Sequence, residues 1–226
     1  GLRGLASQHN VPLAGGDTSE SPNALVLADI VLVGSAPAGR ALRRSGGRAS
    51  DILYVTGRLG GAAAELATLG TPSKRDPSPS HPQLYPQPRL AVGQALLRRR
   101  LATAAIDLSD GLSTDLAHLC RESAVGAEVS ESALPIHPLA AKFGPVRALD
   151  LTLNGGEDYE LLFTAPPSVC MPRSIYGVPI TRIGRLVPGT AVTIIDSTGG
   201  SRDLKPGGWE HFAGPHASKT KTPRRK

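Results

Sequence analysis

The chain has 226 residues, including 26 glycines and 20 prolines, and only 4% of its residues are aromatic. This length suffices for one or two domains with buried cores, and no apolar run approaches the length of a membrane span. Two cysteines, Cys120 and Cys170, are too few for a disulfide framework or a metal knuckle. We therefore expect a soluble, cytoplasmic protein with no membrane partner.

The formal net charge of +6 is concentrated near the C-terminus. Residues 216–226 carry five Lys and Arg and no acid, so the rest of the chain has a net charge near +1. Such a basic segment can contact nucleic acid or anionic lipid. No aromatic interleaving, RNA-binding motif or zinc spacing accompanies it. We predict that residues 214–226 form a disordered tail and expect no nucleic-acid partner, with binding through the tail as an alternative.

Hydrophobic periodicity predicts an α+β fold. The chain begins with the end of a helix that stops near Asn10, and apolar runs predict buried strands at residues 11–14 and 25–33. A proline-rich loop is expected at residues 71–88. The remaining strands are predicted at 51–56, 104–106, 126–129, 159–164, 180–186 and 191–195. The remaining helices are predicted at 59–69, 89–100, 138–142 and 146–149, and from residue 112 onward.

We divide the chain into three parts on this basis. Residues 1–48 contain one helix and two strands, which read as a remnant of an N-terminal α/β domain and its linker. Residues 49–213 form a C-terminal domain with helices packed on a mixed β-sheet, because helices and strands alternate there. The basic tail follows.

The stretch around Asp107-Leu108-Ser109-Asp110 places acidic side chains between a short strand and a helix. Gly111 makes the turn, and Leu112, Leu116 and Leu119 share one helical face. Backbone N–H groups at a helix start attract anions, and carboxylates attract Mg²⁺. A site that holds a metal bound to phosphate uses both, whereas the alternative is that Ser109 and Asp110 only cap the helix.

Two other stretches repeat this pattern of small residues followed by acids. Gly15-Gly16-Asp17 follows the predicted strand at 11–14, and Gly155-Gly156-Glu157-Asp158 leads into the strand at 159–164. Paired glycines let the backbone approach a ligand closely or adopt positive φ. Three such loops predict one shared site for a polyanion and a metal.

The motifs GGDT, D-x-SDGL-x-x-DL-x-HL and GGEDYELLFT, in this order, resemble those of the thiamine-monophosphate kinase family. That family belongs to the ATP-binding superfamily typified by aminoimidazole ribonucleotide synthetase. Further similar segments are RRSGGRASDILYVTG, LYPQPRLAVGQAL, ITRIGRL and GGWEHF, so that the resemblance extends to about Phe212. Acidic motifs that precede this region in the family are not found here, so the chain resembles a member truncated at the N-terminus.

The resemblance implies that ATP phosphorylates thiamine monophosphate to thiamine diphosphate by direct in-line transfer, with Mg²⁺ ions. It assigns Asp17, Asp107 and Asp110 as magnesium ligands, and it implies a homodimer for the full-length family member. ATP would be bound by Asp17, Arg44 and Ser109. Glu157 would hydrogen-bond the thiamine moiety, and Trp209 would offer it an aromatic face. Without the resemblance, Arg44 is equally a solvated linker charge and Trp209 a packing residue.

Three other functions stay open from the sequence. One is a different ATP-dependent enzyme of the same superfamily, which GGEDYELLFT and GWEHF disfavour. Another is a catalytically incomplete fragment or ligand-binding domain that keeps the fold without kinase activity. The third is nucleic-acid binding through the tail.

Overall fold

The computed structural model describes residues 2–21, 24–69 and 81–209, which fall into two units that divide after Ala36. The described part of the first unit contains one helix, α1 (Leu2–Gln8). Asn10 has a left-handed φ of +54°, and the Val11 N–H donates to the carbonyl oxygen of Ala6 at 2.8 Å. These features end a helix, so the prediction of a helix that stops near Asn10 is confirmed.

The two strands predicted in the first unit are wrong. Residues 11–14 and the described residues of 25–33 have no regular secondary structure, and their apolar side chains are exposed. Val26, for example, is 98% exposed and Val33 is 95% exposed. An apolar run forms a stable strand only when other strands pair with it and cover its faces, and the described residues of this unit supply no such partner.

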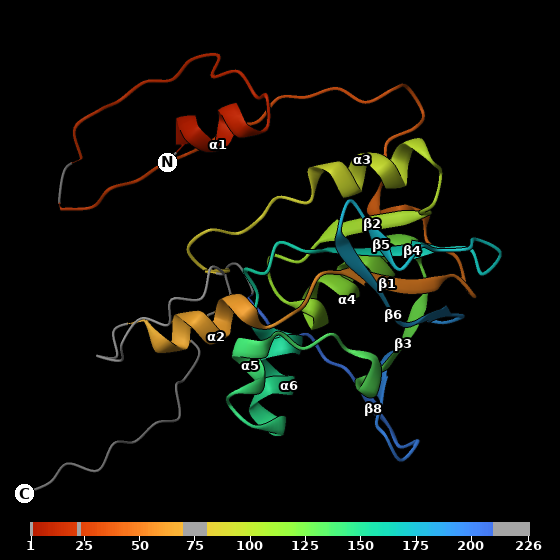
Figure 1. The fold of residues 1–226 in the computed structure, drawn as a ribbon. Coiled ribbons are helices and arrows are strands. Elements are labelled where there is room, and N and C mark those ends of the chain that lie inside the picture. Colours follow the sequence, from red (N-terminus) through yellow and green to blue (C-terminus); the bar gives the residue numbers. More distant parts are fainter. Residues whose placement is uncertain (1, 22–23, 70–80, 210–226) are drawn as a thin grey trace, which may run out of the picture. The chain divides into compact units, whose positions relative to one another are not determined.

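The second unit contains a mixed sheet of eight strands within the described residues, in the order β2-β4-β1-β6-β3-β7-β8, with β5 paired to β6 (Figure 1). Its strands are β1 (Ile52–Thr56), β2 (Ala104–Asp107), β3 (Gly126–Ser130), β4 (Leu161–Ala165), β5 (Ser174–Ile175), β6 (Val178–Val187), β7 (Val192–Ile195) and β8 (Ser201–Asp203). Only the β3–β7 pair is parallel. The predicted α+β class with a mixed sheet is confirmed.

Both faces of this sheet are covered, as the alternation of side chains along each strand requires. On one face, Leu53 and Val55 of β1 belong to a cluster with Leu116 of helix α4 (Leu112–Ser123). On the other face, Phe163 of β4 belongs to a cluster with Leu96 of helix α3 (Leu90–Arg98). In Figure 1 the sheet lies between α3 and α4.

Three further helices pack together beside the sheet, where Figure 1 shows them as neighbours: α2 (Gly61–Thr68), α5 (Pro138–Ala141) and α6 (Pro145–Asn154). Ala64, Ala140 and Leu151, one from each helix, form their small buried core. Helix α6 continues to Asn154, five residues beyond the predicted helical fragment, so it leads directly into the Gly155-Gly156 pair. Two short 3₁₀ helices complete the regular structure of the described residues: η1 (Arg44–Gly46) and η2 (Glu131–Ala133).

Some predictions are not tested by the structure. The domain boundaries 1–48 and 49–213 stay predictions. Part of the proline-rich loop and the basic tail at 214–226 lie outside the described residues. Within the described residues, no helix is both long enough and apolar enough to cross a membrane.

Candidate functional site

The loop after β2 places two of the predicted metal ligands at the start of α4. Asp107 is the last residue of β2 and is exposed, whereas Asp110 is half-buried. The Ser109 hydroxyl donates to Asp110 Oδ1 at 3.3 Å. Gly111 has φ +111° and is the residue from which α4 begins. The acidic loop therefore lies where a strand ends and a helix begins, as the sequence predicts.

Asp115, in the first turn of α4, is hydrogen-bonded to the backbone of this loop. This role was not predicted from the sequence. Its side chain is buried, and Oδ2 accepts hydrogen bonds from the backbone N–H groups of Asp110, at 3.0 Å, and Gly111, at 3.1 Å. A carboxylate that reaches back to the N–H groups before a helix is a form of helix capping. The acid four residues after Gly111 was the signal that could have identified it.

The acidic loop concentrates negative charge. Burial, together with the charges of Asp110 and Asp107, raises the pKa of Asp115 to about 6, against the lowering effect of its two backbone hydrogen bonds. Within the described residues, no Lys, Arg or His forms an ion pair with any of these three carboxylates. Their mutual repulsion is therefore uncompensated by the described chain, and a cation bound there would relieve it.

The predicted substrate-binding loop lies directly beside the acidic loop. Strands β2 and β4 are antiparallel, with Asp107 opposite Leu161, so the residues after β2 adjoin those before β4. The Glu157 N–H donates to the Ser109 carbonyl oxygen at 2.8 Å. A Cβ on Gly156, which has φ +66°, would lie 2.8 Å from that same oxygen. Only glycine allows this approach, which explains the second residue of the Gly155-Gly156 pair.

The segment that carries Trp209 reaches the same loop from the C-terminal side. The Trp209 N–H donates to the Asp110 carbonyl oxygen at 3.0 Å. The N–H groups of Gly207 and Gly208 donate to hydroxyls in the first turn of α4, those of Ser113 and Thr114, each at 3.1 Å. The Trp209 side chain is 66% exposed, and its role toward a ligand stays a prediction.

One predicted residue, Arg44, is not brought to this cluster, and another, Asp17, belongs to the other unit. The Arg44 carbonyl oxygen accepts a hydrogen bond from Ser123, the last residue of α4, at 2.7 Å. A helix of 12 residues is about 18 Å long, so Arg44 lies at the end of α4 opposite to Asp110. Asp17 belongs to the first unit, where its Oδ1 accepts from the Thr18 N–H at 2.8 Å. The roles of Arg44 and Asp17 in binding ATP and metal stay predictions.

The acidic loop suits Mg²⁺ as part of a larger ligand set. Within the described residues, no group of three or more His, Cys, Asp or Glu side chains has the arrangement of a metal site. Asp107 and Asp110 supply hard oxygen donors without a competing protein cation. Mg²⁺ is commonly held by one or two carboxylates together with waters and substrate phosphates. The two aspartates therefore fit a magnesium ion that also binds a phosphorylated ligand.

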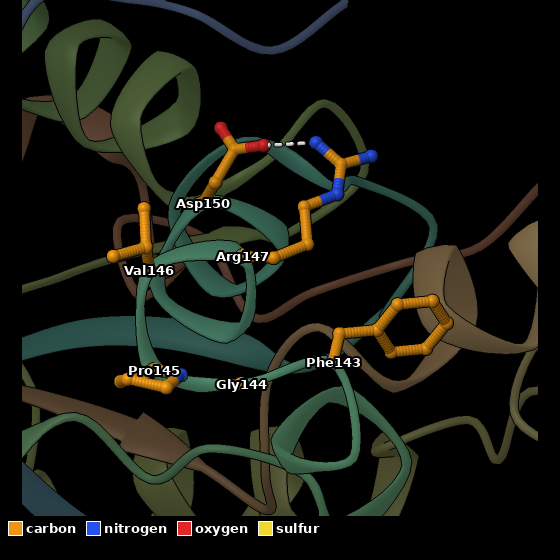
Figure 2. Close-up of a pocket in the computed structure, with 6 residues that line it drawn as sticks. All are labelled: Phe143, Gly144, Pro145, Val146, Arg147 and Asp150. Carbon is orange, nitrogen blue, oxygen red and sulfur yellow. Dashed lines mark hydrogen bonds and ion pairs between the residues drawn. The ribbon is translucent and has the colours of Figure 1, made fainter.

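A hollow on the surface of the second unit lies apart from this cluster. It has a volume of about 470 Å³ and lies around the start of α6 (Figure 2). Phe143 and Val146 are among the residues that line it, and Figure 2 shows Arg147 paired to Asp150 on the same helix. None of the predicted site residues lines it.

Residues 48–196 match the family model described as AIR synthase related protein, C-terminal domain. The chain is 38% identical to the thiamine-monophosphate kinase of Salmonella typhimurium over 229 residues, which cover 95% of this chain and 67% of that enzyme. The chain belongs to the thiamine-monophosphate kinase family.

Solved structures of this kinase family match the same region. A thiamine-monophosphate kinase from Stenotrophomonas maltophilia is 34% identical, with a TM-score of 0.63 over 70% of this chain and 54% of that one. A structure described as AaThiL complexed with AMPPCP and TMP is 32% identical, with a TM-score of 0.62 over 76% of this chain and 54% of that one. The present chain thus spans about two thirds of the length of the curated kinases and about half of these structures.

Proposed function

We propose that this chain binds ATP and thiamine monophosphate and takes part in ATP-dependent phosphorylation of thiamine monophosphate to thiamine diphosphate, with Mg²⁺ as cofactor. The observation that carries this proposal is the meeting of three segments at residues 108–110. The backbone N–H groups of Glu157 and Trp209 donate to the carbonyl oxygens of Ser109 and Asp110. The segments that carry the predicted substrate-binding residues therefore meet at the loop of the predicted metal ligands.

The chemistry of such a transfer fits an acidic loop. Donor and acceptor phosphates are both anionic, so they repel each other until cations screen them and the chain aligns them. Bound Mg²⁺ supplies that screening. Asp107 and Asp110 would hold the ion, Ser109 would contact ATP, and Glu157 with Trp209 would fix the thiamine moiety. No covalent enzyme intermediate is required for direct in-line transfer.

The names of the relatives support this substrate pair. The curated relatives at 38% identity are thiamine-monophosphate kinases, and one solved neighbour holds AMPPCP and TMP. We also expect Asp17 and Arg44 to contribute to metal and ATP binding, and the full-length family member to form a homodimer. The present chain covers only part of the length of these relatives. The kinase activity is therefore a proposal, and the experiments that test it use the present chain.

The test is calorimetric titration of the chain with Mg²⁺ and AMPPCP, and then with thiamine monophosphate. The variant Asp107→Asn/Asp110→Asn removes both charges while keeping the side-chain size. Asp203→Asn, which changes an exposed residue of the edge strand β8, is the matched control. We expect Mg²⁺-dependent binding in the wild-type chain and in the control, and its loss in the double variant. Equal Mg²⁺-dependent binding in all three proteins would refute the proposed site.

A second candidate function is a ligand-binding domain without kinase activity. It is favoured by the first unit, where Asp17 lies on an exposed segment without regular structure. The discriminating measurement is formation of thiamine diphosphate from ATP and thiamine monophosphate, followed by chromatography. Binding together with turnover supports the kinase, whereas binding by a folded chain without turnover supports the ligand-binding domain.

A further inference from the structure

The loop between α6 and β4 has an unusual backbone around Tyr159. Glu157 has φ +60° and Tyr159 has φ +49°, both in the left-handed region that side chains larger than glycine rarely adopt. The surroundings hold this conformation, because the N–H groups of Glu157 and Tyr159 donate to the carbonyl oxygens of Ser109 and Leu108 at 2.8 and 2.9 Å. Strained residues that the surrounding structure fixes in this way cluster at functional sites.

This backbone places the Tyr159 hydroxyl on the carboxylate of Glu157. The distance from Tyr159 Oη to Glu157 Oε2 is 3.3 Å. The Tyr159 side chain is partly exposed, and its partial burial, together with the charges of Glu157, Asp107 and Asp110, raises the pKa of its hydroxyl above the usual value. Tyr159 therefore stays a neutral hydrogen-bond donor at neutral pH, and it lies among the acidic groups of the site.

We propose that Tyr159 is a positioning residue that orients the Glu157 carboxylate toward the aminopyrimidine of the thiamine moiety. This inference rests on the proposed function. The hydroxyl occupies Oε2, which leaves Oε1 to accept a hydrogen bond from the amino group of the ligand. A carboxylate held at one oxygen loses less rotational freedom when the ligand binds, so the preformed contact favours binding.

The proposal predicts selectivity between two pyrimidines. An amino group donates a hydrogen bond to a carboxylate, whereas an oxo group in the same place presents an oxygen that the carboxylate repels. Oxythiamine monophosphate, in which an oxo group replaces the amino group, should therefore bind more weakly than thiamine monophosphate. Tyr159 should strengthen this preference because it acts only through Glu157.

The test compares Tyr159→Phe, which removes only the hydroxyl, with the wild-type chain. Affinities for thiamine monophosphate and oxythiamine monophosphate are measured by calorimetry, and thermal unfolding verifies folding. Tyr176→Phe is the matched control, because Tyr176 is also an exposed tyrosine with positive φ, +51°, but lies in the β5–β6 turn. Glu157→Ala and the double variant Glu157→Ala/Tyr159→Phe complete a double-mutant cycle.

We expect Tyr159→Phe to weaken binding of thiamine monophosphate by about three- to tenfold, the effect of losing one typical hydrogen bond, because the contact with Glu157 is partly open to water. Binding of oxythiamine monophosphate should change little. Adding Tyr159→Phe to the Glu157→Ala variant should not weaken binding of thiamine monophosphate any further. Equal losses for both ligands, an effect that persists without Glu157, or wild-type affinity in Tyr159→Phe would overturn the proposal. If the folded wild-type chain binds no thiamine monophosphate, the proposed function itself fails.

Discussion

The buried ion pair between Arg89 and Glu160 should contribute far more to stability than an ion pair on the surface. Arg89 Nε and Nη2 donate to the two carboxylate oxygens of Glu160 at 2.6 and 2.5 Å, and the Thr56 hydroxyl donates to Oε2 at 2.5 Å. The hydrogen bond to Glu160 raises the pKa of Arg89, against the effect of burial. The Glu160 side chain is only 6% exposed, so its charge depends on these donors.

Arg89→Ala leaves the carboxylate buried with the Thr56 hydroxyl as its remaining side-chain donor. Breaking one side of a buried pair costs about 3–5 kcal/mol. The Arg89 side chain is 22% exposed, and water can enter where it was, so we expect a loss below that range, of about 2–3 kcal/mol. Urea unfolding followed by circular dichroism measures this loss.

Arg147→Ala is the matched control. It breaks the pair with Asp150, in which the two side chains are 58% and 44% exposed, and exposed pairs contribute about 0–1 kcal/mol. The double variant Arg89→Met/Glu160→Leu, which removes both charges, should recover much of the lost stability. If Arg89→Ala costs no more than Arg147→Ala, burial does not make this pair important, and the reasoning is wrong.

Two further perturbations test the packing of the site and its charges. Gly208→Ala should weaken thiamine monophosphate binding, because a Cβ there would overlap the Asp110 carbonyl oxygen and displace Trp209. Calorimetry measures this loss, with Gly93→Ala on α3 as the control, because a Cβ at Gly93 would make only an ordinary van der Waals contact. Equal affinities of the two variants would contradict the prediction. Asp158→Asn should flatten the pH dependence of stability, because burial raises the pKa of this carboxyl in the folded protein from 3.8 to about 6. Between pH 4 and 6 the folded state holds a proton that the unfolded state releases. The unfolding free energy of the wild type therefore falls as the pH rises, by up to about 1.4 kcal/mol per pH unit. Urea unfolding across this range should show a smaller slope for the variant, and an unchanged slope would exclude this titration.

The sequence predicts the second unit well because its elements carry both periodicity and punctuation. Helix α4 combines a leucine face with Gly111 before its start, and the prediction from residue 112 matches its first residue. Strands β5 and β8 were not predicted, since two or three residues are too short for an alternating pattern. The strands predicted at 11–14 and 25–33 are wrong for a different reason. A long apolar run indicates burial, but a strand forms only where other strands pair with it, and the run itself does not specify them.

The candidate site was predictable only where a motif marked it. Adjacent glycines and acids located two loops, that of Asp107 and Asp110 and that of Glu157. The antiparallel pairing of β2 with β4 brings these two loops together. The supporting residues Asp115 and Tyr159 stand within the motifs, but the motifs did not indicate their supporting roles. Their contacts depend on a helix turn and on left-handed backbone angles, which a linear pattern does not specify.

Backbone hydrogen bonds assemble the site and leave its acidic side chains available. The N–H groups of Glu157, Tyr159 and Trp209 each donate to a carbonyl oxygen of residues 108–110. These bonds use none of the carboxylates at Asp107, Asp110 or Glu157, so negative charge accumulates there, and the charges of Asp110 and Asp107 add to the effect of burial in raising the pKa of Asp115. Neutral substitutions of the two aspartates should thus relieve repulsion while removing metal affinity. A gain in stability joined to a loss of Mg²⁺ binding would distinguish a functional carboxylate pair from a merely structural one.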